Sequence, residues 1–207
     1  EARPFGKHHV APVPPVAPGR GRSARFGGIA GDDAVAAVLP SLRKVKKPRV
    51  VTVSSLAGRY GKMNFNDLNS ERTYNPGVAY AQSKLANQMF ATELQRRSKT
   101  ASWGLESMAV HPGVSATDLF VNGPGSKGYY AFLEKIMSQP AAMGALPTLY
   151  AATEPAAMGG CFYGPKSMFE MRGFPGEVKF AAAALDDIAC LELWKISEKL
   201  TGVTYAP

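Results

Sequence analysis

A long helical run lies between two short strand-like segments, and this order constrains the fold more than any other feature. Residues 77–97 read GVAYAQSKLANQMFATELQRR, and from residue 79 onward the run contains neither Gly nor Pro. Its alanine, leucine, glutamine and methionine favour a helix. PRVVTV at 48–53 precedes it and LESMAV at 105–110 follows it, both typical of buried strands. A strand, a helix and a strand in this order predict the βαβ unit of a parallel sheet.

Tyr80 and Lys84 are four residues apart in the predicted helix, so they lie on one face about one turn apart. A phenol, with a reference pKa of about 10, is a poor proton donor or acceptor at neutral pH. A nearby ammonium stabilises the phenolate form, and such a pair can exchange protons with an alcohol or a carbonyl. The same spacing also occurs on ordinary solvated helix faces, so the pair alone does not define a site.

Both predicted strands end in residues that suit a binding site. Ser54 and Ser55 follow the first strand, and Pro112-Gly113 follow the second. In open parallel sheets, ligands bind at the carboxyl ends of the strands. Taken singly, each of these pairs fits an ordinary turn at the end of a strand. Taken in order, they predict that the serine end, the helix with Tyr80 and Lys84, and the Pro-Gly end meet at one edge.

These residues resemble the motifs of the short-chain dehydrogenase/reductase family. The matching segments are VSSLAG at 53–58, YAQSK at 80–84 and HPGVSATDL at 111–119. Residues 63–97 are similar to the retinol-dehydrogenase-like and protochlorophyllide-reductase-like branch, in which F-x-D-L-N precedes A-Y-x-x-S-K-L-A-N. The resemblance covers residues 34–207 and implies an α/β fold, a Rossmann-type parallel sheet flanked by helices.

The resemblance implies an NAD(P)-dependent oxidoreductase that transfers a hydride between nicotinamide and an alcohol or carbonyl group. The expected substrate is a small apolar alcohol, aldehyde or ketone. Tyr80 is then the catalytic acid or base, Lys84 binds the nicotinamide ribose, and Ser55 holds the substrate oxygen. The residues expected at the cofactor are Ser54, Tyr80, Lys84, Pro112, Gly113, Val114 and Thr117. The choice between NADP and NAD, the identity of the substrate and assembly as a homo-oligomer stay open.

The chain departs from the family pattern ahead of its first matching strand. Residues 1–79 contain neither the T-G-x-x-x-G-x-G turn nor the N-N-A-G-type segment of the family. Gly19, Gly21 and Ala24 fit G-x-G-x-x-G/A, but the prolines of the preceding HHVAPVPPVAP exclude a central strand. We therefore expect an N-terminally truncated domain that lacks the nucleotide-binding βαβ units. The alternative function is a non-catalytic remnant that keeps the catalytic half-site but cannot hold the cofactor.

Residues 1–31 are expected to form a disordered or anomalous basic arm, and residues 32–207 the C-terminal part of the dehydrogenase domain. The arm is rich in Pro, Gly and Arg, and most of the net charge of +8 lies in the first 50 residues. Without interleaved aromatic residues or a known motif, nucleic acid is not an expected partner. PFGKHH at 4–9 is similar to the family's F-G-x-N-H segment, with His8 in the Asn position. A shifted reading frame, a genuine divergent arm and a fragment are all compatible with the sequence of residues 1–31.

Further elements follow from hydrophobic periodicity and turn residues. We expect helices at 32–47, 141–153 and 186–200, a final strand at 161–165, and a flexible lid near 119–128 followed by a helix around 132–136. In the first helix, Asp32 is a plausible N-cap and Val35, Val38, Leu39 and Leu42 form the apolar face. The aromatic residues after 128 either line an apolar substrate pocket or pack in the core.

Cysteine usage and hydropathy bound the remaining possibilities. Cys161 and Cys190 lie in apolar contexts and are expected to be reduced, buried thiols of a cytoplasmic protein. Three histidines without metal-ligand spacing predict no metal site. The sequence contains no apolar run long enough to predict a membrane span.

Overall fold

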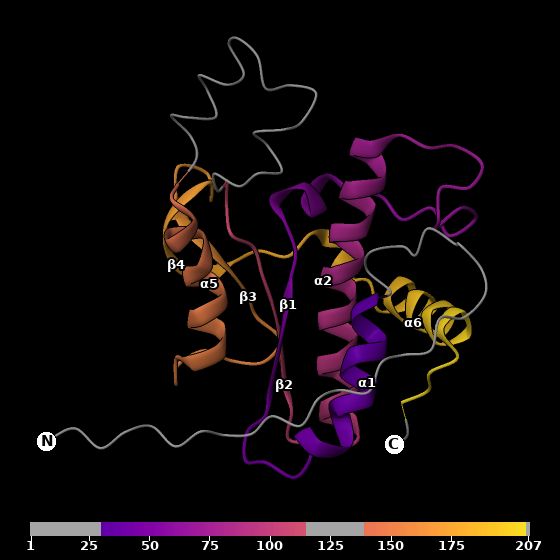
Figure 1. Ribbon diagram of the computed structural model, residues 1–207, viewed down its shortest axis with the longest axis horizontal. Helices are drawn as coiled ribbons and strands as arrows, with labels where there is room; N and C mark the ends of the chain where they lie inside the picture. Colours follow the sequence, from indigo (N-terminus) through magenta and orange to yellow (C-terminus); the bar gives the residue numbers. More distant parts are fainter. Residues whose placement is uncertain (1–29, 115–138, 206–207) are drawn as a thin grey trace, which may run out of the picture.

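A computed structural model describes residues 30–114 and 139–205 (Figure 1). The arm predicted at 1–31 therefore lies almost wholly outside the described residues. The lid near 119–128 and the helix around 132–136 lie outside them as well.

A four-stranded sheet forms the centre of the described fold. Its strands are β1 (Arg49–Val53), β2 (Glu106–Val110), β3 (Phe162–Ser167) and β4 (Arg172–Val178), in the order β1-β2-β3-β4. β1 pairs with β2 in parallel from Arg49↔Glu106 to Val53↔Val110, and β2 pairs with β3 in parallel. The predicted α/β fold with parallel central strands is confirmed. β4 runs antiparallel to β3 and makes the sheet mixed, so the strand predicted as the last one is followed by another.

Helix α2 (Pro76–Thr100) connects β1 to β2 and is the predicted crossover helix. The side chain of Asn75 caps it by accepting hydrogen bonds from the backbone N–H groups of Gly77 and Val78. Pro76 occupies the first turn, where its missing N–H costs nothing. These start signals place the first turn of α2 just ahead of Tyr80.

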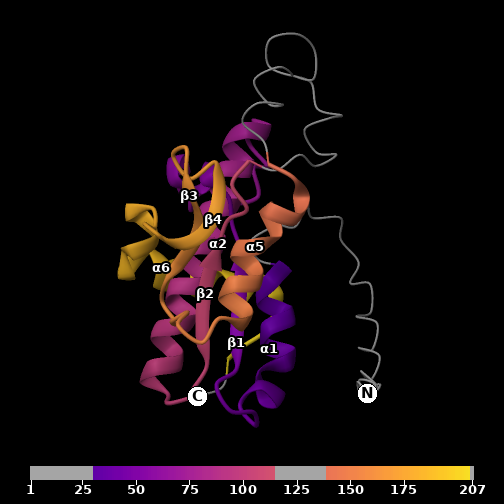
Figure 2. The same ribbon diagram turned by 90° about the vertical axis from the view of Figure 1, so that its left-hand side faces the viewer.

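The other helices cover the two faces of the sheet. They are α1 (Ala30–Leu42), α5 (Ala141–Thr153) and α6 (Asp187–Thr201), with short 3₁₀ segments η1 (Leu56–Tyr60) and η2 (Ala182–Leu185). α1, α2 and α6 lie on one side of the sheet and α5 lies on the other (Figures 1 and 2). η1 and the first turns of α2 lie at the same end of the sheet (Figure 1). This is the end where β1 and β2 finish.

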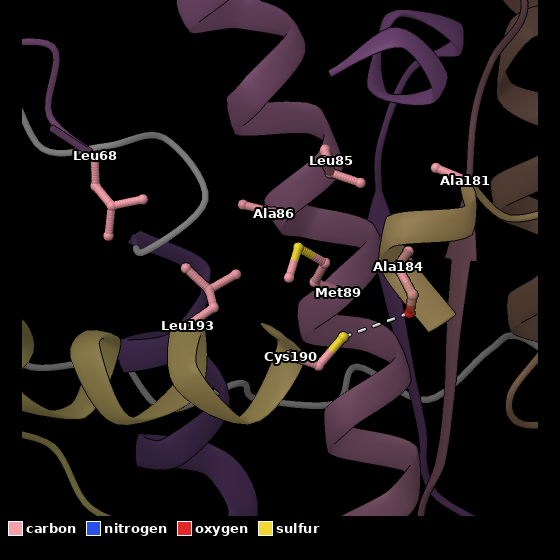
Figure 3. Packing of buried hydrophobic residues seen from close by; sticks show 8 residues of the cluster. All are labelled: Leu68, Leu85, Ala86, Met89, Ala181, Ala184, Cys190 and Leu193. Carbon is pink, nitrogen blue, oxygen red and sulfur yellow. Dashed lines mark hydrogen bonds between the residues drawn. The ribbon is translucent and has the colours of Figure 1, made fainter. Parts of the chain in front are cut away.

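Two clusters of buried side chains hold α2 in place. In one, Leu85 and Met89 of α2 pack against η2 and against Cys190 and Leu193 of α6 (Figure 3). In the other, Phe90 and Leu94 of α2 pack against side chains of α1, of α6 and of the segment that leads into β2. This cluster contains Leu39, Phe90, Leu94, Trp103, Leu105, Trp194 and Tyr205. Because α2 is packed from several directions from Leu85 onward, the position of the helix is set by the core.

Several local predictions differ from the structure. Val53 is 45% exposed because no described strand pairs with the outer edge of β1, whereas the sequence predicts a buried strand. The first helix begins at Ala30, so Asp32 does not precede it, and it ends at Leu42 instead of residue 47. Val38, predicted on its apolar face, is exposed. Cys190 is buried and Cys161 partly buried, and both are free thiols.

Candidate functional site

The two serines at the end of β1 have different surroundings. Ser54 is buried, its hydroxyl donates to the carbonyl oxygen of Lys84 at 2.7 Å, and it accepts from the Gln88 amide at 3.3 Å. Ser55 is partly exposed and caps η1, where its hydroxyl oxygen accepts from the N–H of Ala57 at 3.3 Å. Ser55 is thus the serine whose side chain is accessible, while the hydroxyl of Ser54 is used within the protein.

Tyr80 and Lys84 share one face of α2. The Lys84 ammonium nitrogen lies 5.7 Å from the centre of the Tyr80 ring. Tyr80 is 40% exposed and Lys84 is partly buried. Burial lowers the pKa of Lys84 from its ordinary value, because removal of water disfavours the ammonium. An oxygen-rich partner near Lys84 would restore the lost solvation, so this position suits a hydroxylated or anionic ligand.

Asn87 continues the same helical face one turn beyond Lys84. Its side-chain amide donates to the carbonyl oxygen of Val53 at 2.9 Å. The helix that carries Tyr80 is therefore tied to the last residue of β1, immediately before the two serines.

Close contact through Gly58 brings η1 against the same turn of α2. A Cβ at Gly58 would lie 2.7 Å from the Gln88 amide nitrogen and 2.9 Å from the carbonyl carbon of Lys84. Only glycine allows this approach. The segment that follows Ser55 consequently packs directly on the helical turn that presents Lys84.

The end of β2 forms the third part of the site. The Gly113 N–H donates to Nδ1 of His111 at 3.2 Å, and the Val114 N–H donates to the carbonyl oxygen of Met171 at 2.8 Å. The side-chain amide of Gln139 donates to the carbonyl oxygen of Pro112 at 2.8 Å. The Val114–Met171 bond holds the Pro-Gly turn against the β3–β4 hairpin, and Gln139 adds a link because its side-chain oxygen accepts from the Gly173 N–H at 3.0 Å.

The predicted cofactor residue Thr117 lies outside the described residues. For the other members of the predicted set, the structure places Ser55, Tyr80 and Lys84 on adjoining segments at one end of the sheet. Pro112, Gly113 and Val114 follow the neighbouring strand β2 at its carboxyl end. Their roles toward a cofactor or substrate stay predictions.

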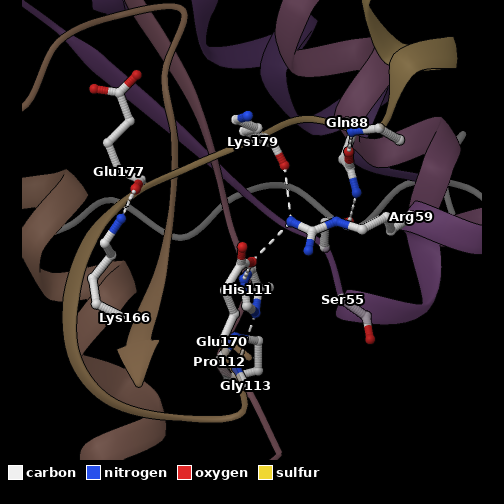
Figure 4. Close-up of polar contacts among 12 residues, drawn as sticks. Ser55, Arg59, Gln88, His111, Pro112, Gly113, Lys166, Glu170, Glu177 and Lys179 are labelled. Atoms are coloured by element: carbon white, nitrogen blue, oxygen red, sulfur yellow. Dashed lines mark hydrogen bonds and ion pairs between the residues drawn. The ribbon is translucent and has the colours of Figure 1, made fainter. Parts of the chain in front are cut away.

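An ion-paired group connects these parts. Arg59 of η1 donates to the Glu170 carboxylate at 2.8 Å, and His111 Nε2 lies 3.2 Å from the same oxygen (Figure 4). Burial lowers the pKa of His111 below its ordinary value, opposed by the hydrogen bond and charge of Glu170. His111 is therefore neutral near pH 7. Ser55 points away from this group in Figure 4.

Four residues that organise the site are assigned no role by any sequence motif: Asn87, Gln88, Gln139 and Glu170. Asn87 is detectable in principle, because it lies seven residues after Tyr80 on the same helical face. The contacts of Gln88, Gln139 and Glu170 join segments far apart in sequence and leave no periodic signal. Within 30–114 and 139–205 the structure shows no grouping of His, Cys, Asp and Glu suited to a metal ion.

Comparison with known proteins identifies the fold. Human retinol dehydrogenase 14 is 31% identical over 171 residues, which cover 80% of this chain. Human retinol dehydrogenase 12 is 49% identical over 77 residues, or 37% of the chain. The crystal structure of an uncharacterized protein from Mycobacterium paratuberculosis is 35% identical, superposes with a TM-score of 0.66 and matches 89% of the chain. The chain belongs to the short-chain dehydrogenase/reductase family.

Within this short-chain dehydrogenase/reductase family, the chain is retinol-dehydrogenase-like, and the family is one of oxidoreductases. No protein-family model matches the chain. The chain spans 48% of the length of human retinol dehydrogenase 14 and 59% of the solved bacterial chain. None of the helices in the described part of this dehydrogenase-like chain has the length and apolar character needed to cross a membrane.

Proposed function

We propose that this chain carries the catalytic half of an NAD(P)-dependent oxidoreductase acting on an alcohol or carbonyl group. The observation that carries the proposal is the position of Lys84, 5.7 Å from the Tyr80 ring, on a helical turn packed against the segment after Ser55. A proton-transfer group, a cation beside it and an accessible hydroxyl donor are the parts that such a reaction requires.

The residues present fit the nicotinamide end of a dinucleotide. Lys84 lies on the face of α2 that carries Tyr80, and its ammonium lacks part of its hydration, as expected for a group that binds ribose hydroxyls. The Pro112-Gly113 turn leaves the carboxyl end of β2, next to β1 in the sheet. When bound, the nicotinamide supplies or accepts the hydride. The Gly-rich turn that would hold the pyrophosphate is not among residues 1–207.

Each side chain has one task in the proposed reaction. In the reducing direction, the carbonyl carbon gains a hydride and the carbonyl oxygen takes the phenolic proton of Tyr80, giving an alcohol. In the oxidising direction, the tyrosinate accepts the hydroxyl proton as the carbon loses its hydride. Lys84 stabilises the tyrosinate through its charge, and Ser55 donates a hydrogen bond to the substrate oxygen.

An apolar substrate is favoured by the side chains around the first turns of α2. Tyr60, at the end of η1, is exposed, as are Tyr74, just before α2, and Val78 in the first turn of α2. Phe162 and Tyr163 are instead buried in the core, so the aromatic residues of β3 do not line a pocket. Tyr129, Tyr130 and Phe132 lie outside the described residues. The proposed substrate is a small apolar alcohol, aldehyde or ketone.

The test compares the loss of the same hydroxyl group at two tyrosines in different positions, Tyr80 and Tyr74. The chain is assayed for oxidation of NADH and NADPH with apolar aldehydes and ketones, beside Tyr80→Phe and Tyr74→Phe. Tyr80→Phe is expected to lower kcat by about 10²–10⁴-fold, the usual contribution of a positioned proton donor. Tyr74→Phe removes an exposed hydroxyl but keeps the apolar ring, so it is expected to leave kcat unchanged.

The alternative is a protein with the same geometry and no turnover, a non-catalytic remnant. It is favoured by the missing pyrophosphate-binding turn. A folded chain that reduces none of the aldehydes and ketones with either nicotinamide would support this alternative. Turnover that Tyr80→Phe and Tyr74→Phe reduce equally would contradict the role proposed for Tyr80.

A further inference from the structure

The turn between β3 and β4 has a backbone that residues other than glycine rarely adopt. Met168, Phe169 and Glu170 follow one another with φ values of 47°, 55° and 66°. Three left-handed residues in succession are unfavourable and persist only where surrounding contacts impose them. Met168 and Phe169 are exposed, so the side chain that anchors this turn is that of Glu170.

Glu170 joins three segments through one carboxylate oxygen. Arg59 of η1 donates to Oε2 at 2.8 Å, and His111 at the end of β2 contacts the same oxygen at 3.2 Å (Figure 4). The same Arg59 nitrogen donates to the carbonyl oxygen of Lys179, just after β4, at 3.0 Å. The turn is thereby linked to η1, which follows Ser55, and to the residue that precedes Pro112-Gly113.

The contacts of His111 fix its tautomer. The Gly113 N–H donates to Nδ1 at 3.2 Å, so Nδ1 is an acceptor and the ring proton resides on Nε2. Nε2–H then donates to Glu170. The imidazole is fully buried, packs edge-on against Phe162 and fills the space where a side chain at Gly164 would stand. The orientation of the ring therefore depends on the bond between Nε2 and Glu170, and it determines whether Nδ1 can accept from the Gly113 N–H.

The hairpin also contacts the Pro-Gly turn directly. The carbonyl oxygen of Met171, the residue after Glu170, accepts from the Val114 N–H at 2.8 Å. Gly113 has a φ of 69°, and a Cβ there would clash with the same carbonyl oxygen. The hairpin and the Pro-Gly turn are thus packed backbone to backbone at Met171, the residue that follows Glu170.

We propose that Glu170 is a positioning residue that holds His111 in its Nε2–H tautomer and so sets the Pro112-Gly113 turn relative to η1 and Ser55. Its effect on turnover rests on the proposed function, because that function places the nicotinamide at this turn. The effect of Glu170 on the position of the Pro112-Gly113 turn does not depend on the proposed function. Glu170 acts through His111 and Arg59 and contacts no reacting atom.

If Glu170 has a purely local role in the hairpin, the substitution Glu170→Gly should have the opposite effect to the one that our proposal predicts. If residue 170 serves only the backbone of the hairpin, Glu170→Gly relieves an unfavourable φ and leaves the Pro-Gly turn unchanged. Phe169→Gly provides the matched control, because Phe169 has the same backbone conformation and a side chain that is 92% exposed. Glu192→Gln controls for the loss of one carboxylate, because Glu192 is an exposed residue of α6 and takes no part in the contacts of the hairpin turn.

The experiment measures amide hydrogen exchange of Gly113 and the ring nitrogen shifts of His111 in the ¹⁵N-labelled 207-residue chain. We expect Glu170→Gly and the isosteric Glu170→Gln to accelerate Gly113 exchange by about tenfold or more, as loss of a charge-assisted contact implies. Both are expected to give a mixture of His111 tautomers. Phe169→Gly and Glu192→Gln are expected to leave exchange and tautomer as in the parent, and Phe169→Gly to raise Tm.

Two results would overturn the proposal. One is parental Gly113 exchange in Glu170→Gln, a variant that keeps the side-chain shape if Glu170→Gly fails to fold. The other is equal acceleration in Phe169→Gly and Glu170→Gly, which would assign the effect to the turn backbone. Where the parent turns over, Glu170→Gln should raise KM for the nicotinamide cofactor without moving the pH profile. A parent without turnover removes the proposed function and leaves the exchange result to decide the role of Glu170.

Discussion

The hydroxyl of Ser54 donates a hydrogen bond of 2.7 Å to the carbonyl oxygen of Lys84. This bond ties the end of β1 to the helical turn that presents the ammonium of Lys84. It also gives the two serines separate tasks. Ser54 joins the strand to the helix from within the protein, and Ser55 is left with an accessible side chain.

Loss of the Ser54 hydroxyl should therefore destabilise the fold. Ser54→Ala leaves a buried carbonyl and the Gln88 amide without this partner, and we expect a loss of about 1–3 kcal/mol in the free energy of unfolding. Urea unfolding measures the change. Ser83→Ala is the control, because the Ser83 hydroxyl donates to a carbonyl of its own helix, that of Tyr80, and is partly exposed. Equal losses in the two variants would contradict the bridging role of Ser54.

The close approach at Gly58 gives a second prediction. Gly58→Ala places a methyl group 2.9 Å from the carbonyl carbon of Lys84, so η1 and α2 must separate. We expect a loss of about 1–3 kcal/mol in stability, typical of overpacking. Gly77→Ala, where the nearest atom is 3.4 Å away, is expected to be neutral or stabilising because alanine favours the helix. Thermal unfolding compares them, and a stable Gly58→Ala protein would show that the contact is not tight.

His111 makes stability depend on pH in a definite direction. Burial lowers its pKa below the ordinary value of 6.5, with Glu170 opposing and Arg59 reinforcing the shift. Between the ordinary and the lowered value, the unfolded chain binds a proton that the folded chain does not. The free energy of unfolding contributed by His111 is therefore fully present above pH 6.5 and falls as the pH drops through this window. Protonation would also turn a donor toward the Gly113 N–H.

The measurement is urea unfolding from about pH 7 to about pH 5, with His111→Gln as the comparison. Each unit by which the pKa is lowered is worth about 1.4 kcal/mol, so the parent should lose more stability than the variant over this range. His8 and His9 are present in both proteins and cancel in the difference. Parallel pH profiles would show that His111 takes up its proton without penalty in the folded state.

Cofactor affinity gives a fourth prediction. The 207-residue polypeptide contains residues suited to the nicotinamide end but no Gly-rich turn for the pyrophosphate. We expect NAD(H) and NADP(H) to bind with a Kd weaker than about 10 μM, or a free energy less favourable than about −7 kcal/mol. Calorimetric titration decides this, and Lys84→Ala should weaken any binding that is detected. Binding tighter than this limit would mean that another segment of the chain holds the pyrophosphate.

The sequence predicts the order of the central elements because their signals are local. A β-branched run, an uninterrupted helical run and a second apolar run suffice for the βαβ unit, and α2 extends the predicted helix at both ends. The spacing of Tyr80 and Lys84 places them on one helical face in any helix. These features depend only on neighbouring residues, so they can be inferred before the tertiary structure is known.

The buried side of α2, in contrast, cannot be predicted from the sequence pattern. Gln82, Gln88 and Gln95 are buried there, although glutamine is usually exposed. Each is satisfied by a partner from another element: Gln82 by Leu68, Gln88 by Ala181 and Gln95 by Ser107. A hydrophobic pattern cannot reveal such a face, because the polar groups are compensated only after the chain has folded.

Local sequence patterns are enough to predict the parallel strand-helix-strand order, the shared face of Tyr80 and Lys84, and the serine and Pro-Gly ends of two strands. Three features become apparent only in the folded molecule: which serine is accessible, the antiparallel strand β4 at the edge of the sheet, and the contact between Glu170 and His111 across 59 residues of sequence. The reason is physical. Backbone conformation and side-chain periodicity are local properties, whereas a buried hydrogen bond exists only when both partners are brought together by packing.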